Sequence, residues 1–344
     1  MTSTPHTSDA AHTSDVPDTT DAPDTSDASA TAGTAGTTGS PDLRAQLDSL
    51  TTEAFRPELA EIDRLSTLEI ATLMNGEDAG VPGAVARQLP VIAAAIDAVA
   101  ARMGRGGRLV YAGAGTAGRL GVLDASECPP TFNTDPAQVV GLIAGGPPAM
   151  VTSVEGAEDS AELARADLDA LVLTAEDAVV GVSASGRTPY AIGAVEHARR
   201  LGALTIGLAC NPGSALAAAA DHGIEIVVGP ELITGSTRLK AGTAQKLVLN
   251  MLSTITMIRL GKTYGNLMVD VRASNEKLRA RSRRIVALAT GATDEEIERA
   301  LAGSGGEVKD AILSILAGVD APTAARLLAE NRGHLREALA AARG

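Results

Sequence analysis

Residues 113–130 contain a glycine-rich turn followed by an isolated glutamate, and their residue types are well suited to chemistry. The turn reads Gly113-Ala-Gly115-Thr116-Ala-Gly118. Glycines that follow a strand let the backbone turn tightly and approach a ligand. The free N–H groups at the start of the next helix favour an anion. We therefore expect Gly115 and Thr116 to contact an anionic ligand.

The same glycines also match the dinucleotide-binding fingerprint Gly-x-Gly-x-x-Gly. An NAD site of that kind requires an acidic residue at the end of the second strand, where it binds the ribose hydroxyls. Here the second candidate strand ends in Ile143-Ala-Gly-Gly146 and has no carboxylate. The pattern therefore favours a sugar phosphate or another anion over NAD.

Two further loops rich in hydroxyl groups precede helical runs, at residues 183–189 and 234–240. Hydroxyls and backbone N–H groups can surround a phosphate without a metal. One such loop could equally be an ordinary helix cap. Three such loops in one α/β unit favour a phosphate site, in which Lys240 would neutralise the phosphate charge. Arg187 and Arg119 could contribute as well, or could instead be structural ion-pair partners. The candidate substrate-binding residues are Gly115, Thr116, Ser183, Ser185, Arg187, Thr188, Ser236, Thr237 and Lys240.

Two glutamates are candidates for acid–base chemistry, Glu127 and Glu158. The helix after the glycine turn is expected to end near Ser126, so that Glu127 could point back over the ligand. Carboxylates beside a partly desolvated pocket can act as general acid and base, although most acidic residues are solvated or cap helices. Cys128 has no neighbouring histidine to activate it, and the scattered histidines form no visible metal cluster.

The elements that would position these residues are short strands alternating with helices. Strands rich in Val, Ile and Leu that alternate with helices predict an α/β fold, with a doubly wound, mostly parallel sheet covered on both faces. In such a sheet the ligand lies beyond the carboxyl ends of the strands. The candidate strands are 108–112, 139–144, 178–183, 204–208 and 224–228, and the candidate helices between them are 118–126, 160–171, 189–201 and 214–220.

Composition divides the chain into three regions, of which the central one contains this alternation. Residues 1–42 contain seven Asp but no Lys or Arg and little to bury, which predicts a disordered acidic tail. Residues 43–290 form the predicted α/β domain. It begins with helices, including a capping box at Ser66 and Glu69 and a long helix after Pro82-Gly83, and it includes a buried helix at 240–260. Residues 291–344 predict a small C-terminal domain of three amphipathic helices, which would serve packing or dimer support.

The overall composition excludes several partners. The 344 residues carry a net charge of −13 and only 1% aromatic residues, which disfavours nucleic acids and anionic membranes. There is no signal-peptide pattern and no apolar run long enough for a membrane span. Two cysteines without zinc-ligand spacing agree with a reducing compartment. We expect a cytoplasmic protein.

Taken together, these motifs resemble the N-acetylmuramic acid 6-phosphate etherases from about Thr52 to Leu339. The first glycine loop departs from the family pattern, since Ala117 replaces a serine. If that serine hydroxyl bonded the ligand, its loss would weaken ligand binding by about 1 kcal/mol, while the backbone N–H would remain in place. The resembling segments are Glu61–Thr67, Gly113–Arg119, Leu123–Pro130, Val154–Asp159, Ser183–Tyr190, Gly235–Gly242, Gln245–Thr254 and Gly265–Asp270.

The resemblance implies a sugar-isomerase (SIS) domain, a C-terminal module similar to ubiquitin-associated domains, and a homodimer with sites near the subunit interface. It implies cleavage of the D-lactyl ether of N-acetylmuramic acid 6-phosphate by elimination and water addition, without a cofactor or metal. The catalytic glutamates of the family fall on Glu127, the proton donor, and Glu158.

A donor carboxyl must be protonated near neutral pH, so we expect Glu127 in a desolvated position beside Pro129 and Pro130. Related SIS domains leave two alternatives. One is a sugar-phosphate-binding regulator of the glucokinase regulatory type, and the other is an aldose–ketose isomerase.

Overall fold

The computed structural model describes residues 47–271 and 276–343. The acidic tail predicted for residues 1–42 lies outside the described residues. Among the described residues, no single helix has both the length and the apolar character needed to cross a membrane, although two sharply bent helix pairs meet the criterion together.

The α/β fold predicted from the alternating pattern is confirmed. A five-stranded sheet has the order β2-β1-β3-β4-β5, and every neighbouring pair is parallel. The last strand begins two residues earlier than its apolar run suggested, because its pairing with β4 starts at His222. The strands are β1 (Leu109–Gly113), β2 (Val139–Ile143), β3 (Ala178–Val182), β4 (Leu204–Ala209) and β5 (His222–Glu225).

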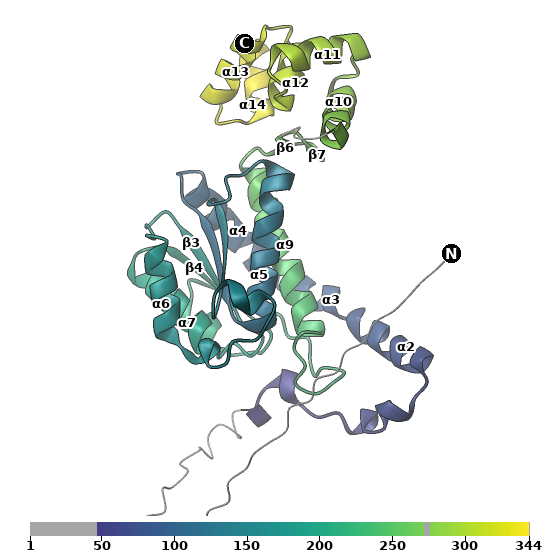
Figure 1. The fold of residues 1–344 in the computed structure, drawn as a ribbon, viewed down its shortest axis with the longest axis vertical. Helices are drawn as coiled ribbons and strands as arrows, with labels where there is room; N and C mark the ends of the chain where they lie inside the picture. Colours follow the sequence, from purple (N-terminus) through teal and green to yellow (C-terminus); the bar gives the residue numbers. More distant parts are fainter. Residues whose placement is uncertain (1–46, 272–275, 344) are drawn as a thin grey trace, which may run out of the picture. The chain divides into compact units, whose positions relative to one another are not determined.

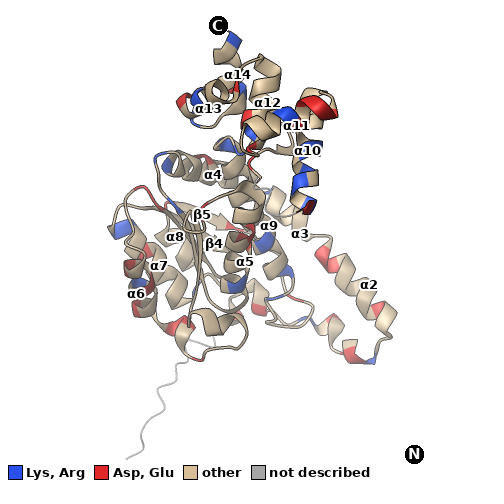
Figure 2. Ribbon diagram, turned by 45° about the horizontal axis from the view of Figure 1, so that its top comes forward, with Lys and Arg blue, Asp and Glu red and all other residues tan. Residues whose placement is uncertain are grey.

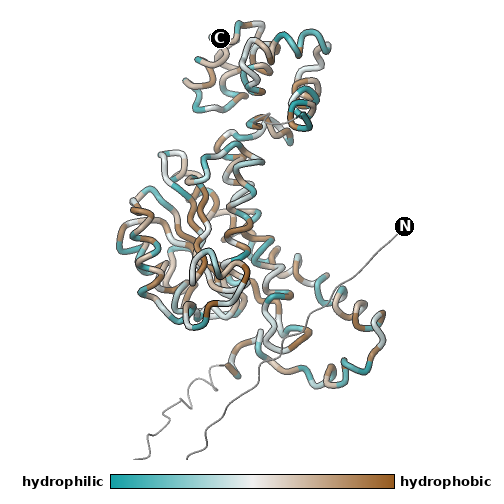
Figure 3. The backbone as a smooth tube through the Cα atoms, viewed as in Figure 1, coloured by the Kyte–Doolittle hydropathy of each residue, from teal (hydrophilic) through white to brown (hydrophobic). Residues whose placement is uncertain are grey.

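Both faces of the sheet are buried. In β1, Leu109 and Tyr111 belong to one apolar cluster, whereas Val110 and Ala112 belong to another, because successive side chains of a strand point to opposite faces. The hydrophobic strands therefore lie between two layers of helices (Figures 1 and 3). One layer contains α4 (Leu89–Met103), α5 (Gly115–Phe132) and α9 (Lys240–Arg259); the other contains α6 (Ala161–Ala170) and α7 (Pro189–Arg200), with α8 (Ala215–Ala219) packed on α7.

Charged residues are confined largely to helices and loops (Figure 2). Among the five strands, only β5 contains a Lys, Arg, Asp or Glu residue, namely Glu225. Any charge that acts on a ligand at the sheet must therefore come from the loops or from the helix ends.

The helix expected to end near Ser126 continues to Phe132, through Pro129 and Pro130. Prolines normally end a helix because they lack the N–H group. Here the helix ends instead at Asn133, which adopts a left-handed conformation and donates its N–H to the carbonyl of Pro129 at 2.9 Å. Glu127 therefore lies within a helix and not at its end.

The predicted long helix after Pro82-Gly83 is two helices, α3 (Val81–Ala86) and α4. Pro90 lies in the first turn of α4, and its ring would clash with the carbonyl four residues earlier if the helix were continuous. Upstream, where the domain was predicted to begin with helices, the chain first forms three short 3₁₀ turns, η1 (Thr51–Glu53), η2 (Pro57–Leu59) and η3 (Ile62–Arg64). The capping box at Ser66 and Glu69 is confirmed and begins α2 (Thr67–Asp78).

The C-terminal helices share one apolar core, to which all five contribute buried residues. This core includes Ile285 and Val286, which precede the domain boundary predicted at residue 291. The helix α14 was not among the three predicted helices. The helices are α10 (Glu276–Thr290), α11 (Asp294–Gly303), α12 (Val308–Ala317), α13 (Ala321–Glu330) and α14 (Leu335–Arg343), preceded by the hairpin β6 (Thr263–Tyr264) and β7 (Leu267–Met268).

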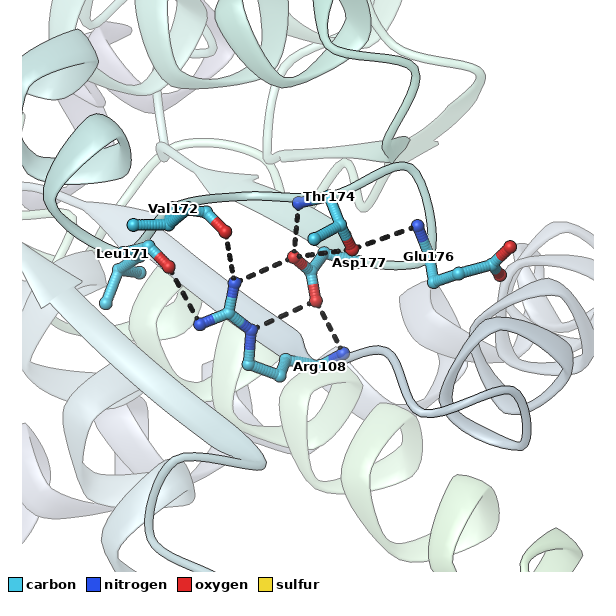
Figure 4. Close-up of polar contacts among 6 residues, drawn as sticks. All are labelled: Arg108, Leu171, Val172, Thr174, Glu176 and Asp177. Atoms are coloured by element: carbon cyan, nitrogen blue, oxygen red, sulfur yellow. Dashed lines mark hydrogen bonds and ion pairs between the residues drawn. The ribbon is translucent and has the colours of Figure 1, made fainter.

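An ion pair between the half-buried Arg108 and the buried Asp177 joins the amino ends of β1 and β3. The Asp177 carboxylate accepts bonds from the Arg108 guanidinium at 2.8 and 3.1 Å and from the backbone N–H groups of Arg108 and Thr174, both at 2.8 Å (Figure 4). Burial alone would raise the pKa of Asp177, but these bonds hold the pKa below its usual value. Arg108 also donates to the carbonyls of Leu171 and Val172, so one guanidinium anchors the loop that enters β3.

Asp177→Asn should lower the free energy of unfolding by about 2–3 kcal/mol at pH 7, since it weakens several charge-assisted bonds to a buried group. The folded-state pKa of Asp177 is lowered, so its contribution is present above the unfolded-state value and is lost as the pH falls through the folded-state value. Urea unfolding at pH 7 and at low pH measures the effect, which should shrink in acid. Glu176→Gln is the matched control, because its exposed pair with Arg105 should contribute less than about 1 kcal/mol. If both variants lowered the free energy of unfolding equally, Asp177 would not have the stabilising role proposed here.

Candidate active site

A cavity of about 470 Å³ opens at the carboxyl ends of β1 and β3. These strands are neighbours, and the chain leaves them toward opposite sides of the sheet, which is where ligands bind in open parallel sheets. The volume is within the usual range for small-molecule sites. The lining residues are Leu47, Leu50, Glu53, Ala114, Gly115, Thr116, Ala117, Glu158, Asp159, Ser183, Ala184, Ser185, Arg187, Thr188, Pro189, Thr237 and Gln245.

The loop after β3 gathers three hydroxyl groups. Ser183 Oγ lies 2.7 Å from Thr188 Oγ1 and 3.2 Å from Ser185 Oγ, and it accepts a bond from the Gly186 N–H at 3.0 Å. Gly186 has φ +69°, and a Cβ there would lie 2.4 Å from Cβ of Ser214. The turn therefore requires glycine, and it directs the hydroxyls into the cavity.

The glycine turn after β1 brings the start of α5 against the sheet. A Cβ at Gly118 would lie 2.6 Å from the Gly113 carbonyl oxygen, so only glycine allows this approach. Ala114, at the N-cap of α5, makes no side-chain cap bond. The first-turn N–H groups beside Gly115 and Thr116 are therefore suited to an anion.

The third loop contributes Thr237, but the structure does not bring Ser236 or Lys240 to the cavity. Lys240 is buried, and its Nζ donates to Glu77 of α2 at 2.5 Å. The backbone N–H of Lys240 and that of Ala241 donate to the buried carboxylate of Glu231, both at 3.0 Å. Lys240 therefore neutralises a carboxylate of this chain, a role that loop spacing alone could not reveal.

Carboxylates reach the cavity from two distant segments. Glu158 and Asp159 come from the 3₁₀ turn η5 (Ala157–Asp159), and Glu53 comes from η1. Asn211 holds the Glu53 segment in place, since its side chain bonds Thr51 and Thr52 and also donates to the Ala184 carbonyl at 3.0 Å. Glu53 could not be predicted as a cavity residue, because no local sequence pattern links it to the hydroxyl loop.

Glu127 does not line this cavity and is exposed on α5. It lies eleven residues after Thr116 in one continuous helix, which separates the two residues by about 16 Å along the helix axis. A glutamate side chain cannot cover that distance. The expectations that Glu127 points back over the ligand and that it is desolvated in this chain are therefore wrong, because α5 does not end at Ser126.

The residues around Glu127 on α5 are nevertheless tightly held. Asp124, one turn earlier, is buried and accepts bonds from Tyr111 at 2.7 Å, Asn250 at 2.6 Å and Ser253 at 3.1 Å. Burial raises the pKa of Asp124. Burial, with the charge of Asp124, also raises the pKa of the Cys128 thiol to about 12, which argues against a nucleophilic cysteine.

Gln245 also lines the cavity, although it was not among the predicted site residues. It lies on α9, is 1% exposed, and its Nε2 has no hydrogen-bond partner. One turn earlier, Gly242 brings the helix close to both loops, since a Cβ there would lie 3.5 Å from Thr116 and from the Thr237 carbonyl. A polar residue within the apolar 240–260 helix was the available signal.

The described residues contain no group of three or more His, Cys, Asp or Glu side chains that could hold a metal ion. That neither metal nor cofactor takes part remains a prediction.

Comparison with known proteins defines the class of this site. Residues 91–199 match the family model of the glucokinase regulatory protein N-terminal SIS domain, and residues 157–255 match the model of the SIS domain. A solved structure of a phosphoheptose isomerase from Francisella tularensis is similar, with a TM-score of 0.44 and 20% identity over 56% of this chain and 100% of the other. The two family matches assign the fold of this chain to the SIS domain class.

The curated relatives identify the family. An N-acetylmuramic acid 6-phosphate etherase of Streptomyces coelicolor is 84% identical over 88% of this chain and 98% of its own length. Relatives with the same name from Rubrobacter xylanophilus and Serratia proteamaculans are 63% and 57% identical, over 97% and 99% of their own lengths and 86% and 85% of this chain. The chain belongs to the N-acetylmuramic acid 6-phosphate etherase family.

Proposed function

We propose that this chain cleaves the D-lactyl ether of N-acetylmuramic acid 6-phosphate, giving N-acetylglucosamine 6-phosphate and D-lactate. The observation that carries the proposal is that Glu158 and the hydroxyl loop after β3 line the same cavity. Hydroxyls and helix-start N–H groups suit the phosphate, and a carboxylate beside them suits proton transfer to or from the sugar. Family membership at up to 84% identity supports the same activity.

The proposed chemistry is an elimination followed by hydration. Opening of the sugar to its C1 aldehyde makes the C2 proton acidic, and a carboxylate removes that proton. The C3–O bond then breaks, its electron pair goes to the lactyl oxygen, and an acid protonates that oxygen. Water adds across the C2–C3 double bond. We assign the donor role to Glu127 and a second acid–base role to Glu158, with no metal or cofactor required.

With Glu127 as the proposed donor, its distance from the cavity of its own chain requires a homodimer in which the donor comes from a second copy. Leu123, one turn before Glu127 on the same face of α5, is 51% exposed. Leu68 of α2 is 77% exposed, and α2 buries none of its residues. Exposed apolar surface of this kind suits a subunit interface. We propose that a partner chain covers Leu123 and places its own cavity beside Glu127.

A lactate-release assay with N-acetylmuramic acid 6-phosphate tests the proposed function. Release of D-lactate, with solvent ¹⁸O found at C3 of the sugar, is the expected result. Binding without any product would favour the regulator, and a ketose product without lactate would favour the isomerase. Label found only in lactate would contradict the elimination.

The environment proposed for the protein is the cytoplasm, with a small sugar phosphate as its ligand and neither nucleic acid nor membrane as a partner. The two described cysteines, Cys128 and Cys210, are buried free thiols, which suits a reducing compartment.

Gln245→Met should separate binding from stability. A buried donor without a partner destabilises the ligand-free protein by about 1–3 kcal/mol, so its removal should raise the ligand-free melting temperature. The same change should raise KM, because the amide can no longer donate to the sugar phosphate. Thermal unfolding with and without N-acetylglucosamine 6-phosphate, together with KM, measures both effects.

The matched control is Thr256→Val on the same helix, because Thr256 Oγ1 is also buried without a partner but does not line the cavity. This variant should gain stability and keep its KM. An unchanged KM in Gln245→Met would show that the amide does not bind the ligand.

A further inference from the structure

A second cavity, of about 260 Å³, adjoins the first. The two share Ala114, Gly115 and Glu158, so the Glu158 side chain lies at the boundary between them. The second cavity is smaller than most sites for whole ligands, which suits it to one arm of a larger molecule. Its lining residues are Ala114, Gly115, Arg119, Ala144, Ala149, Ser153, Val154, Glu155, Gly156 and Glu158.

The outer wall of this cavity is a turn that folds back toward the sheet. It leaves β2 through Gly145, with φ +87°, and a Cβ there would lie 2.7 Å from Cβ of Val154. Val154 can pack this closely only on a glycine. This contact fixes the turn that carries Ser153 and Glu155, which line the cavity together with Gly115 at the start of α5.

Arg119 is the cation of the second cavity. It lies in the second turn of α5, half-buried, and its Nε donates to the Met150 carbonyl at 3.0 Å, which orients the guanidinium. In the part of the chain that the structure describes, no carboxylate lies within ion-pair distance of it, although Glu155 and Glu158 line the same cavity. By contrast, the buried Lys240 and the half-buried Arg108 each have a carboxylate partner.

We propose that the second cavity binds the carboxylate of the D-lactyl arm, with Arg119 as its counter-ion. The inference rests on the proposed etherase function. The substrate has two anionic groups, a phosphate and a carboxylate, joined through the sugar and the ether. With the phosphate at the hydroxyl loop and the carboxylate at Arg119, the ether lies at the boundary of the two cavities. Glu158 lies at that same boundary, where proton transfer is needed.

This arrangement makes Arg119 a specificity-determining residue. A guanidinium recognises a carboxylate through two parallel charge-assisted bonds. N-acetylglucosamine 6-phosphate lacks the lactyl arm, so its affinity should not depend on Arg119. The cleaved sugar would therefore lose the Arg119 contact when the lactyl arm leaves.

The test compares both ligands on two proteins that carry Glu158→Gln, which slows turnover, one with Arg119 and one with Arg119→Met. Calorimetry should show that Arg119→Met weakens binding of N-acetylmuramic acid 6-phosphate about 10- to 100-fold. Binding of N-acetylglucosamine 6-phosphate should change less than about 2-fold. Arg119→Lys keeps the charge but loses the planar fork, and it should fall between wild type and Arg119→Met.

Two controls keep the outcomes distinct. Arg187→Met, in the first cavity, should weaken both ligands because its effect does not depend on the lactyl arm. Equal weakening of both ligands by Arg119→Met, or no weakening at all, would overturn the proposal. The binding measurement does not depend on turnover, so a wild-type protein that releases no lactate would contradict the proposed function without deciding the lactyl subsite.

Discussion

Glu158→Gln is expected to lower kcat for lactate release by about 10²- to 10⁴-fold, with a smaller change in KM, because one proton transfer loses its carboxylate. Glutamine keeps the size and hydrogen-bonding capacity of the side chain. Glu158 lies where the two cavities meet, so its removal should affect bond cleavage more than phosphate binding. Steady-state lactate release and calorimetric binding of N-acetylglucosamine 6-phosphate measure the two effects.

The matched control is Glu162→Gln. Its side chain is 79% exposed on α6, pairs with Arg165, and lines neither cavity. This variant should keep its activity within about 2-fold, since exposed ion pairs contribute little. If Glu158→Gln retained comparable activity, Glu158 would not be an acid–base group.

Glu127→Gln is expected to reduce lactate release by a similar factor of about 10²–10⁴ if Glu127 protonates the leaving oxygen. The distance from Thr116 to Glu127 along α5 requires that the donor serve the cavity of a second copy. Mixed dimers test this requirement. A dimer that joins one Glu127→Gln chain to one Glu158→Gln chain would contain one complete site of two, so about half of wild-type activity should return.

The reciprocal dimer provides the control. It joins a chain with both substitutions to a wild-type chain, and the same model predicts no complete site. If Glu127 acted within its own chain, the outcomes would be reversed, with activity only in this second dimer. Co-expression with two affinity tags isolates each mixed dimer. A Glu127→Gln homodimer with near-wild-type activity would remove Glu127 from the mechanism.

The strands and the loop chemistry were accessible from the sequence because each depends on residues adjacent in the chain. Runs such as Leu204–Ala209 are apolar because a parallel sheet buries both faces. Loops after parallel strands meet at one edge, so the predicted meeting of Thr116 with Ser183 required only the order of the elements.

The helix end at residue 126 was predicted incorrectly because Pro129-Pro130 is a local stop signal that the tertiary structure overrides. Asp124 ties α5 to β1 and α9 through Tyr111, Asn250 and Ser253. Packing of this kind stabilises a helix beyond its intrinsic preference. The position of Glu127 depended on that packing.

By itself, the sequence determined the parallel α/β sheet, the hydroxyl-rich loops at its carboxyl edge and the resemblance to the etherase family. These follow from periodicity and from neighbouring residues. Only the tertiary structure decided that Lys240 pairs with Glu77, that Glu53 and Gln245 enter the cavity, and that Glu127 lies far from it. The contact between Lys240 and Glu77 joins residues 163 positions apart, and Glu53 and Gln245 are still further apart in the chain. Packing and hydrogen bonding between distant elements decide them, and no local pattern records which distant partner a side chain will find.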